Sequence, residues 1–139
     1  MNDIALDKKN FDLCFIDAEH TDTACFRDFI YAMKIIKDDS IIVLHDSHII
    51  YKALIMINEL LISEKKKFKF IKIINSSMSI FFLNNFYQDK FINMFDYEKD
   101  IEKFYKSSER RRLEANVKNR VKVSLNLSVE EAIMKDKIY

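Results

Sequence analysis

Residues 11–46 read FDLCFIDAEHTDTACFRDFIYAMKIIKDDSIIVLHD, and this stretch decides the fold. It holds two short apolar runs, residues 11–16 and 41–44, and each is soon followed by an aspartate. Such runs are typical of strands that are buried on both faces of a parallel sheet. Between them, an apolar side chain recurs every three or four positions, as along one face of a helix: Cys25, Phe26, Phe29, Ile30, Met33 and Ile36. The stretch therefore predicts two neighbouring parallel strands joined by a right-handed helical crossover.

The chain up to residue 84 predicts the rest of an α/β sheet. A second amphipathic pattern follows the second strand and predicts another helix. Two β-rich runs come next, and the three polar residues between them, Asn75 to Ser77, indicate a hairpin. We therefore expect helices over about residues 22–37 and 48–65, and strands over residues 12–16, 41–45, 68–74 and 78–83.

Residues 85–139 differ in character from the rest of the chain. Aromatic side chains lie among many charges as far as residue 105, which predicts one or two helices packed on the surface. Residues 121–127, VKVSLNL, alternate strictly and are a candidate fifth strand or ordered arm. Ser128 and Glu131 form a capping box, which predicts the start of a terminal helix. We therefore divide the chain into a partial α/β domain, residues 1–84, and a charged, mainly helical extension, residues 85–139.

The composition excludes several classes of protein. The 139 residues carry a net charge of +1, are 49% hydrophobic and include neither glycine nor proline. One domain with a core is expected at this length, and the glycine-rich loops that bind phosphates or dinucleotides are excluded. The balanced charge argues against nucleic acid as a partner, and no apolar run is long enough for a membrane span or a signal peptide. We expect a soluble, cytoplasmic protein in which Cys14 and Cys25 stay reduced.

Two aspartates occupy equivalent positions at the ends of the two predicted parallel strands. Asp17 follows the first strand and Asp46 follows the second, with His20 and His45 beside them. Ligands of open α/β sheets bind at the carboxyl ends of the strands, and neighbouring strands lie about 4.8 Å apart. The two carboxylates can therefore share a hard divalent cation such as Mg²⁺, which prefers oxygen ligands. A histidine beside that ion can accept a proton from a hydroxyl group.

The same kinds of residue also have plain structural interpretations. An aspartate that follows a strand often caps the next helix, and His48 is interpreted as a solvated or capping residue in the first turn of a helix. The three arginines at residues 110–112 are interpreted as a solvated helix face, with phosphate contact as the alternative. The equivalent positions of Asp17 and Asp46, each beside a histidine, favour the functional interpretation for that pair.

Two segments resemble a known enzyme family. FDLCFIDAEHTDTACFRDF and IIKDDSIIVLHDS are similar to the second half of a class I S-adenosylmethionine-dependent methyltransferase, in particular the small-molecule O-methyltransferase group with its Asp-x-x-His and His-Asp motifs. The resemblance spans residues 10–84. It implies half of a Rossmann-like sheet of four strands, with the first three parallel and the last antiparallel between the second and third. It also implies S-adenosylmethionine as methyl donor and a small-molecule or sugar hydroxyl as acceptor.

The resemblance assigns roles to four residues. In metal-dependent relatives, the residues that match Asp17 and the pair His45 and Asp46 bind magnesium, and the histidine that matches His20 is the general base. The family's cofactor-binding half, with its glycine-rich loop, has no counterpart in these 139 residues. We therefore expect the chain alone to be inactive and to show no detectable binding of S-adenosylmethionine.

The absent half also leads to an expectation about association. In a complete domain, residues 12–16 would pair with a further strand. That edge, with the side chains of Cys14 and Ile16, is expected to be open, covered by the tail or paired with a second chain, and self-association would follow. The alternative function is a non-enzymatic half-domain that acts as an interaction module. A third alternative is phosphate or nucleic-acid binding through the basic residues between 110 and 122.

Overall fold

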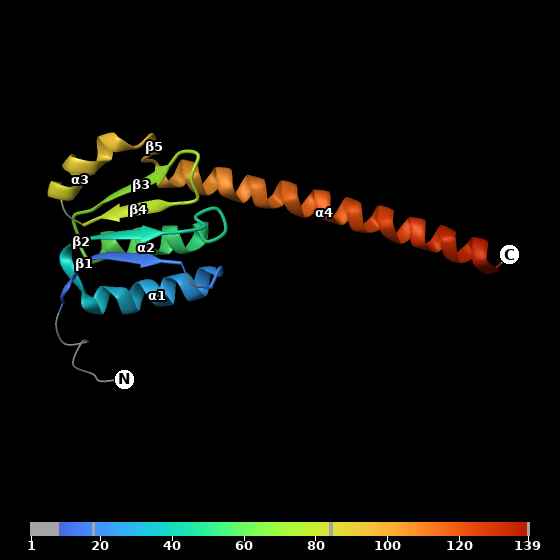
Figure 1. Cartoon of the computed structure of the whole chain (residues 1–139), viewed down its shortest axis with the longest axis horizontal. Helices are drawn as coiled ribbons and strands as arrows, with labels where there is room; N and C mark the ends of the chain where they lie inside the picture. The colour runs from blue at the N-terminus through green and yellow to red at the C-terminus, as the bar shows by residue number, and fades with distance from the viewer. Residues whose placement is uncertain (1–8, 18, 84, 139) are drawn as a thin grey trace. The chain divides into compact units, whose positions relative to one another are not determined.

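The computed structural model of the chain describes residues 9–17, 19–83 and 85–138, and the backbone alone for residues 123–138. The chain divides into two compact units, Met1–Lys106 and Ser107–Tyr139. The first unit holds an open five-stranded sheet with helices (Figure 1), which confirms an α/β fold. The second unit is formed by the greater part of one long helix, α4, which spans Ile101–Ile138.

The sheet has the strand order β1-β2-β4-β3-β5. Its strands are β1, Phe11–Ile16; β2, Ile36–Leu44; β3, Lys69–Ile73; β4, Ser79–Phe82; and β5, Tyr97–Glu98. β1 and β2 are parallel, and β4 is antiparallel to both β2 and β3, so β3 runs parallel to β2. The pairings predicted for the first four strands are confirmed. The short strand β5, antiparallel to β3, is an addition that the sequence does not predict.

The pairing of β1 with β2 brings the carboxyl ends of the two strands level. The Ile16 carbonyl accepts a hydrogen bond from the His45 N–H group at 3.1 Å, so the ladder continues to the last residue of β1. At the other end of the two strands the register is irregular. Phe11 pairs with Ile36 but Leu13 pairs with Ile41, so β2 contains extra residues between these two pairs. The irregularity therefore lies far from the strand ends that are followed by the aspartates.

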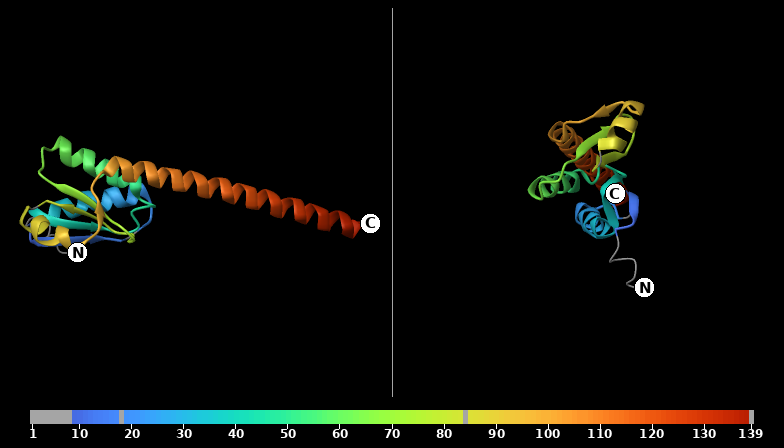
Figure 2. Two further views of the ribbon diagram at one scale, coloured as in Figure 1. Left: turned by 90° about the horizontal axis from the view of Figure 1, so that it is seen from above. Right: turned by 90° about the vertical axis from the view of Figure 1, so that its left-hand side faces the viewer.

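Two helices cover one face of the sheet (Figures 1 and 2). α1, Asp22–Ile35, begins after the N-cap residue Thr21, whose hydroxyl accepts from the Ala24 N–H group at 3.2 Å. α2, Tyr51–Ser63, has no side-chain cap at its own N-cap residue. Instead, the Asp22 carboxylate accepts from the Ala53 N–H group at 2.9 Å. Both helices agree with the predicted ranges to within three residues at each end.

The main core lies between these two helices and the sheet. It includes fully buried side chains from the helices and the strands: Phe29, Ile42, Leu54, Ile57 and Phe81. Phe104, in the first turn of α4, belongs to the same core. Apolar burial of this kind is the main force that holds such a sheet and its helices together.

The opposite face of the sheet has a second, smaller core. α3, Asn85–Phe91, and the short 3₁₀ helix η2, Ile92–Met94, lie on that side (Figure 2). Four buried side chains form the centre of this core: Ile71, Ile80, Phe82 and Ile92. All four come from β3, β4 and η2, and β2 adds partly buried neighbours. No β1 residue belongs to this second core as far as the described residues show.

The exposed side chains of β1 are not the ones that the sequence predicts. Cys14 and Ile16 are expected from the sequence to be open, covered by the tail or paired with a second chain. Instead, Ile16 is only 7% exposed and Cys14 packs against the main core of its own chain. Successive side chains of a strand point to opposite faces. The exposed set is therefore the alternate one: Phe11, Leu13 and Phe15 are 50%, 59% and 52% exposed.

The C-terminal part is mainly helical, as predicted, but two details of the prediction are wrong. α4 runs unbroken through residues 121–127, so these residues form helix and not a strand, and no helix begins at Ser128. Alternation favours a strand only where neighbouring strands complete the ladder, whereas a helix satisfies its backbone groups locally. The predicted domain boundary after residue 84 stays a prediction. No helix in the described part of the chain is long and apolar enough to cross a membrane.

Candidate functional site

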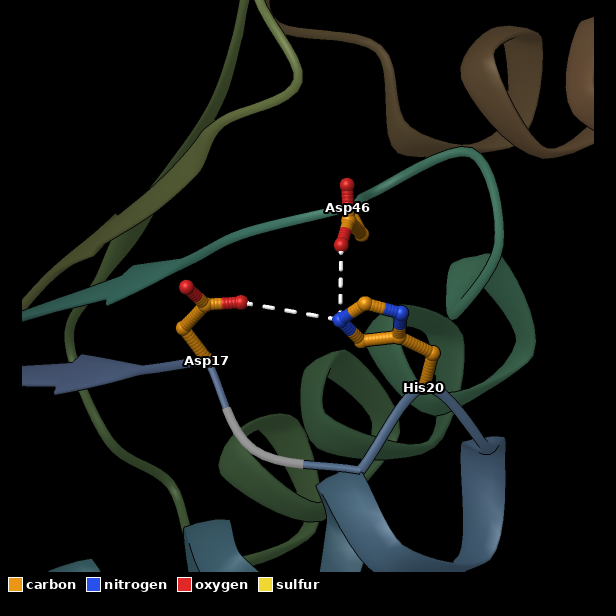
Figure 3. A group of neighbouring side chains, drawn as sticks. All are labelled: Asp17, His20 and Asp46. Carbon is orange, nitrogen blue, oxygen red and sulfur yellow. Dashed lines mark ion pairs between the residues drawn. The ribbon is translucent and has the colours of Figure 1, made fainter.

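Asp17, His20 and Asp46 converge at the carboxyl ends of β1 and β2 (Figure 3). Asp17 directly follows β1, Asp46 lies two residues after β2, and His20 stands just before the N-cap of α1. Each side chain offers one ligand atom, and these atoms all lie within 4.8 Å of one another. The proximity predicted from the sequence is confirmed, whereas the roles of the three residues stay predictions.

His20 lies between the two aspartates. Its Nε2 atom is 2.9 Å from Oδ2 of Asp46 and 3.7 Å from Oδ1 of Asp17 (Figure 3). The His20 side chain is 54% exposed and the Asp46 side chain 21%. His20 is therefore the member of the group that faces solvent most openly, where an imidazole can exchange a proton with a bound molecule.

His45 approaches the same two carboxylates. Its Nδ1 atom lies 3.2 Å from Oδ1 of Asp17 and 3.1 Å from Oδ2 of Asp46. Neither contact is aligned as a hydrogen bond, and the described residues offer this buried Nδ1 atom no other hydrogen-bond partner. A buried polar atom without a partner calls for an explanation. A cation held between the carboxylates would provide one.

The four contacts between ring nitrogens and carboxylate oxygens have similar lengths. They range from 2.9 to 3.7 Å and involve the same two oxygens, Oδ1 of Asp17 and Oδ2 of Asp46. Neighbouring ligands of an ion with bonds of about 2.1 Å are roughly 3.0 to 3.4 Å apart. The three ligand atoms of Asp17, His20 and Asp46, all within 4.8 Å of one another, are close enough together to hold one divalent cation. Carboxylate oxygens suit Mg²⁺, and imidazole nitrogens suit first-row transition metals.

Ser77 holds the other side of the His45 ring. Its Oγ atom lies 2.8 Å from Nε2 of His45. The turn that carries Ser77 is itself anchored, because the Ser47 hydroxyl donates to the Ser77 carbonyl at 2.8 Å and the Ser79 hydroxyl donates to Ser47 at 2.6 Å. Sequence reasoning places Ser77 in the hairpin turn and misses this contact. The strand order could have indicated this contact. β4 lies next to β2, so the turn that precedes β4 lies beside the end of β2, where His45 follows.

Asp46 has a left-handed backbone conformation, with φ at 54°. Aspartate tolerates this region better than most residues because its short polar side chain bonds locally. The Asp46 carbonyl accepts from the N–H groups of Ile49 and Ile50 at 2.8 and 3.2 Å, which turns the chain towards α2. In a sequence without glycine, this aspartate therefore makes the turn and also presents a carboxylate to the group.

The other residues singled out from the sequence lie outside this group. The His48 ring lies 5.2 Å from the ring of Phe104, so it is packed against an aromatic side chain rather than simply solvated. Arg110 forms an ion pair with Glu114 at 3.0 Å, four residues further along α4. Such exposed pairs are common on helix surfaces and contribute little to stability.

These observations define a class of protein: an open α/β sheet with a polar site at the carboxyl ends of adjacent parallel strands, where such folds bind their ligands. The chain matches a family model described as a methyltransferase domain over residues 2–47. That segment includes β1, α1 and β2 and ends one residue after Asp46. The match supports a methyltransferase domain. No curated protein and no solved structure gives a significant match to the chain.

Proposed function

We propose that this chain is the C-terminal part of an S-adenosylmethionine-dependent methyltransferase that acts on a hydroxyl group of a small molecule or sugar. The match of residues 2–47 to a methyltransferase domain supports methyl transfer in general. The observation that carries the finer proposal is the convergence of Asp17, His20 and Asp46 within 4.8 Å at the strand ends.

In this proposal, Asp17, Asp46 and His45 would hold a divalent cation such as Mg²⁺. When bound, such an ion lowers the pKa of a hydroxyl group that coordinates it. His20 would accept the proton of the acceptor hydroxyl at Nε2, the ring atom that faces the two carboxylates. The Asp46 carboxylate, 2.9 Å away, keeps the His20 ring turned towards the site. The chain's own residues thus orient the acceptor and remove its proton.

In this proposal, the methyl donor is bound outside this chain. Methyltransferases use S-adenosylmethionine generally, and the resemblance implies that a glycine-rich loop binds it. The sequence has no glycine, so no such loop exists in it. We therefore propose that another polypeptide segment supplies the cofactor-binding half and that the chain alone is inactive.

Calorimetric titration with S-adenosylmethionine tests this proposal. The 139-residue chain alone should give no heat of binding. A fusion that places the glycine-rich N-terminal half of a methyltransferase domain before residue 1 should bind the cofactor, and His20→Gln in that fusion should retain binding but lose methyl transfer to a hydroxyl acceptor. Tight cofactor binding by the unfused chain would contradict the proposal.

The alternative is a non-enzymatic half-domain that acts as an interaction module. The specific observation that favours it is the apolar outer face of β1, where Phe11, Leu13 and Phe15 are at least half exposed. The two functions differ in one measurable respect. A module would bind a partner through β1 whether or not Asp17 and Asp46 are intact, whereas the enzyme requires both carboxylates.

A further inference from the structure

Strand β1 combines two features of an interaction surface. It stands at the end of the strand order and, in the described ranges of the chain, pairs with β2 alone. Its outer face carries three exposed apolar side chains in alternate positions, Phe11, Leu13 and Phe15. An unpaired strand edge is a template for pairing with another strand, and clustered apolar exposure marks a contact surface.

The direction of the backbone groups limits how another strand can pair with this edge. The Ile16 carbonyl accepts from His45 of the β2 side, and the Asn10 N–H group donates to the Ile35 carbonyl at 2.9 Å. The even-numbered residues therefore direct their backbone groups towards β2. Because alternate residues of a strand bond to opposite sides, the backbone groups of Phe11, Leu13 and Phe15 point to the open edge.

We propose that two copies of this chain associate through their β1 strands, antiparallel, about a two-fold axis at Leu13. This inference goes beyond the proposed function: it concerns this chain alone, because the cofactor-binding half of a complete domain would pair with the same edge of β1. In this register Leu13 lies opposite Leu13 of the second copy and Phe11 lies opposite Phe15. Every odd-numbered residue then meets another odd-numbered residue, so the outward N–H and C=O groups pair with one another. The six exposed apolar side chains of the two β1 strands, three from each copy, then lie on one face of the joined sheet.

The neighbouring registers are less favourable. A shift by one step towards the N-terminus places Asp12 opposite Asp12 of the second copy, and like charges that lie directly opposite are destabilising. A shift towards the C-terminus places Phe11 opposite Asp17. In the register centred on Leu13, Asp12 lies opposite Cys14 and no like charges meet. The strand is therefore self-complementary in one register, as an isologous two-fold contact requires.

Charge complementarity at both ends favours a second copy over an unrelated partner. In the register centred on Leu13, Lys9 of each chain lies opposite Asp17 of the other, whose carboxylate also lies 3.2 Å from His45 of its own chain. Lys9 also contacts Asp38 of its own chain at 2.6 Å, and its side chain is 47% exposed, so it remains accessible at the end of the strand. Because the contact is two-fold, this pairing of Lys9 with Asp17 occurs once at each end.

Sedimentation equilibrium of the full chain at micromolar concentrations tests the association. The wild-type chain should form a dimer. Leu13→Asp places two carboxylates opposite each other at the two-fold axis and should weaken the dimer at least about 100-fold. Tyr31→Asp is the matched control, because Tyr31 is a similarly exposed apolar residue, 58%, on α1; this variant should dimerise like the wild type. Urea unfolding should show that both variants fold.

Cross-linking in a Cys14→Ala background tests the register. Residues opposite each other in hydrogen-bonded pairs have Cα atoms about 5.5 Å apart, within the range for a disulfide. Leu13→Cys should cross-link to itself, whereas Phe11→Cys and Phe15→Cys should cross-link only when the two variants are mixed. Four results would each overturn the proposal. The first two are a monomeric wild-type chain and a Leu13→Asp variant that still dimerises. The others are self-cross-linking of Phe11→Cys and a dimer that forms only after residues 1–8 are removed.

Discussion

The Oγ atom of Ser77 lies 2.8 Å from Nε2 of His45, and this contact ties the turn between β3 and β4 to the carboxylate group at the ends of β1 and β2. Because one ring nitrogen of His45 faces Ser77, the other, Nδ1, faces Asp17 and Asp46. A partner on the far nitrogen fixes the orientation of a metal-binding imidazole. Ser77 is therefore a positioning residue for the site that we propose.

Ser77→Ala should weaken the binding of a divalent cation by roughly tenfold, because the His45 ring loses the group that orients it. Stability should fall by only about 1 kcal/mol, the usual contribution of one hydrogen bond. Mn²⁺ titration and urea unfolding measure the two effects. Ser76→Ala is the control, because the Ser76 hydroxyl accepts from the Met78 N–H group and does not contact His45. Equal losses of affinity in both variants would speak against a specific role for Ser77.

Asp22 links the start of α1 to the first turn of α2 through its bond to the Ala53 N–H group. Asp22→Ala should lower the free energy of unfolding by about 1–2 kcal/mol, since α2 has no other side-chain cap and its N–H group is left without an acceptor. Asp22→Asn retains an acceptor oxygen and should recover most of the loss. Chemical denaturation of the wild-type chain and the two variants measures these differences. If Asp22→Ala were as stable as the wild-type chain, water would have replaced the Asp22 carboxylate as the acceptor.

Lys65 ends α2 in a left-handed conformation, with φ at 54°. The N–H groups of Lys65 and Lys66 donate to the carbonyls of Ile62 and Leu61, respectively, at 3.0 Å each. In helix ends with this pattern of hydrogen bonds, the left-handed position is usually occupied by glycine. Lys65→Gly should therefore raise the stability of the chain by about 1 kcal/mol. Thermal unfolding measures the gain. Lys67→Gly, two residues further on, should give no gain, and a similar rise in both variants would contradict the backbone explanation.

Much of the fold follows from apolar patterns, and the exceptions have physical reasons. The pairing of β1 and β2 and the positions of Asp17 and Asp46 are predictable because buried parallel strands have a clear pattern. β5 is not, because two residues, Tyr97 and Glu98, are too few to produce a pattern. The exposed face of β1 depends on which face the helices cover, and the sequence alone does not specify this for a short, mostly apolar run.

The two cysteines should differ in reactivity. Burial, together with the nearby carboxylates of Asp28 and Asp22, raises the pKa of Cys25 to about 12, and burial also raises the pKa of the half-buried Cys14. At pH 8 about one Cys25 thiol in 10,000 is then ionised, and the thiolate is the reactive form. Iodoacetamide should therefore modify Cys14 first in the folded chain, and both at similar rates in urea. Equal rates in the folded chain would contradict this account.

The central claim is that Asp17, Asp46 and the neighbouring histidines form a site for a divalent cation, and calorimetric titration with Mg²⁺ tests it most directly. The wild-type chain should bind one ion weakly, with roughly millimolar affinity for a site of few protein ligands. Asp46→Asn should abolish binding without disturbing the fold, because asparagine also tolerates the left-handed backbone at this position. Asp17→Ala should abolish it as well, and Asp89→Asn, on α3, should leave it unchanged. Absence of binding to the wild-type chain, or equal binding by the wild-type chain and Asp46→Asn, would contradict the claim.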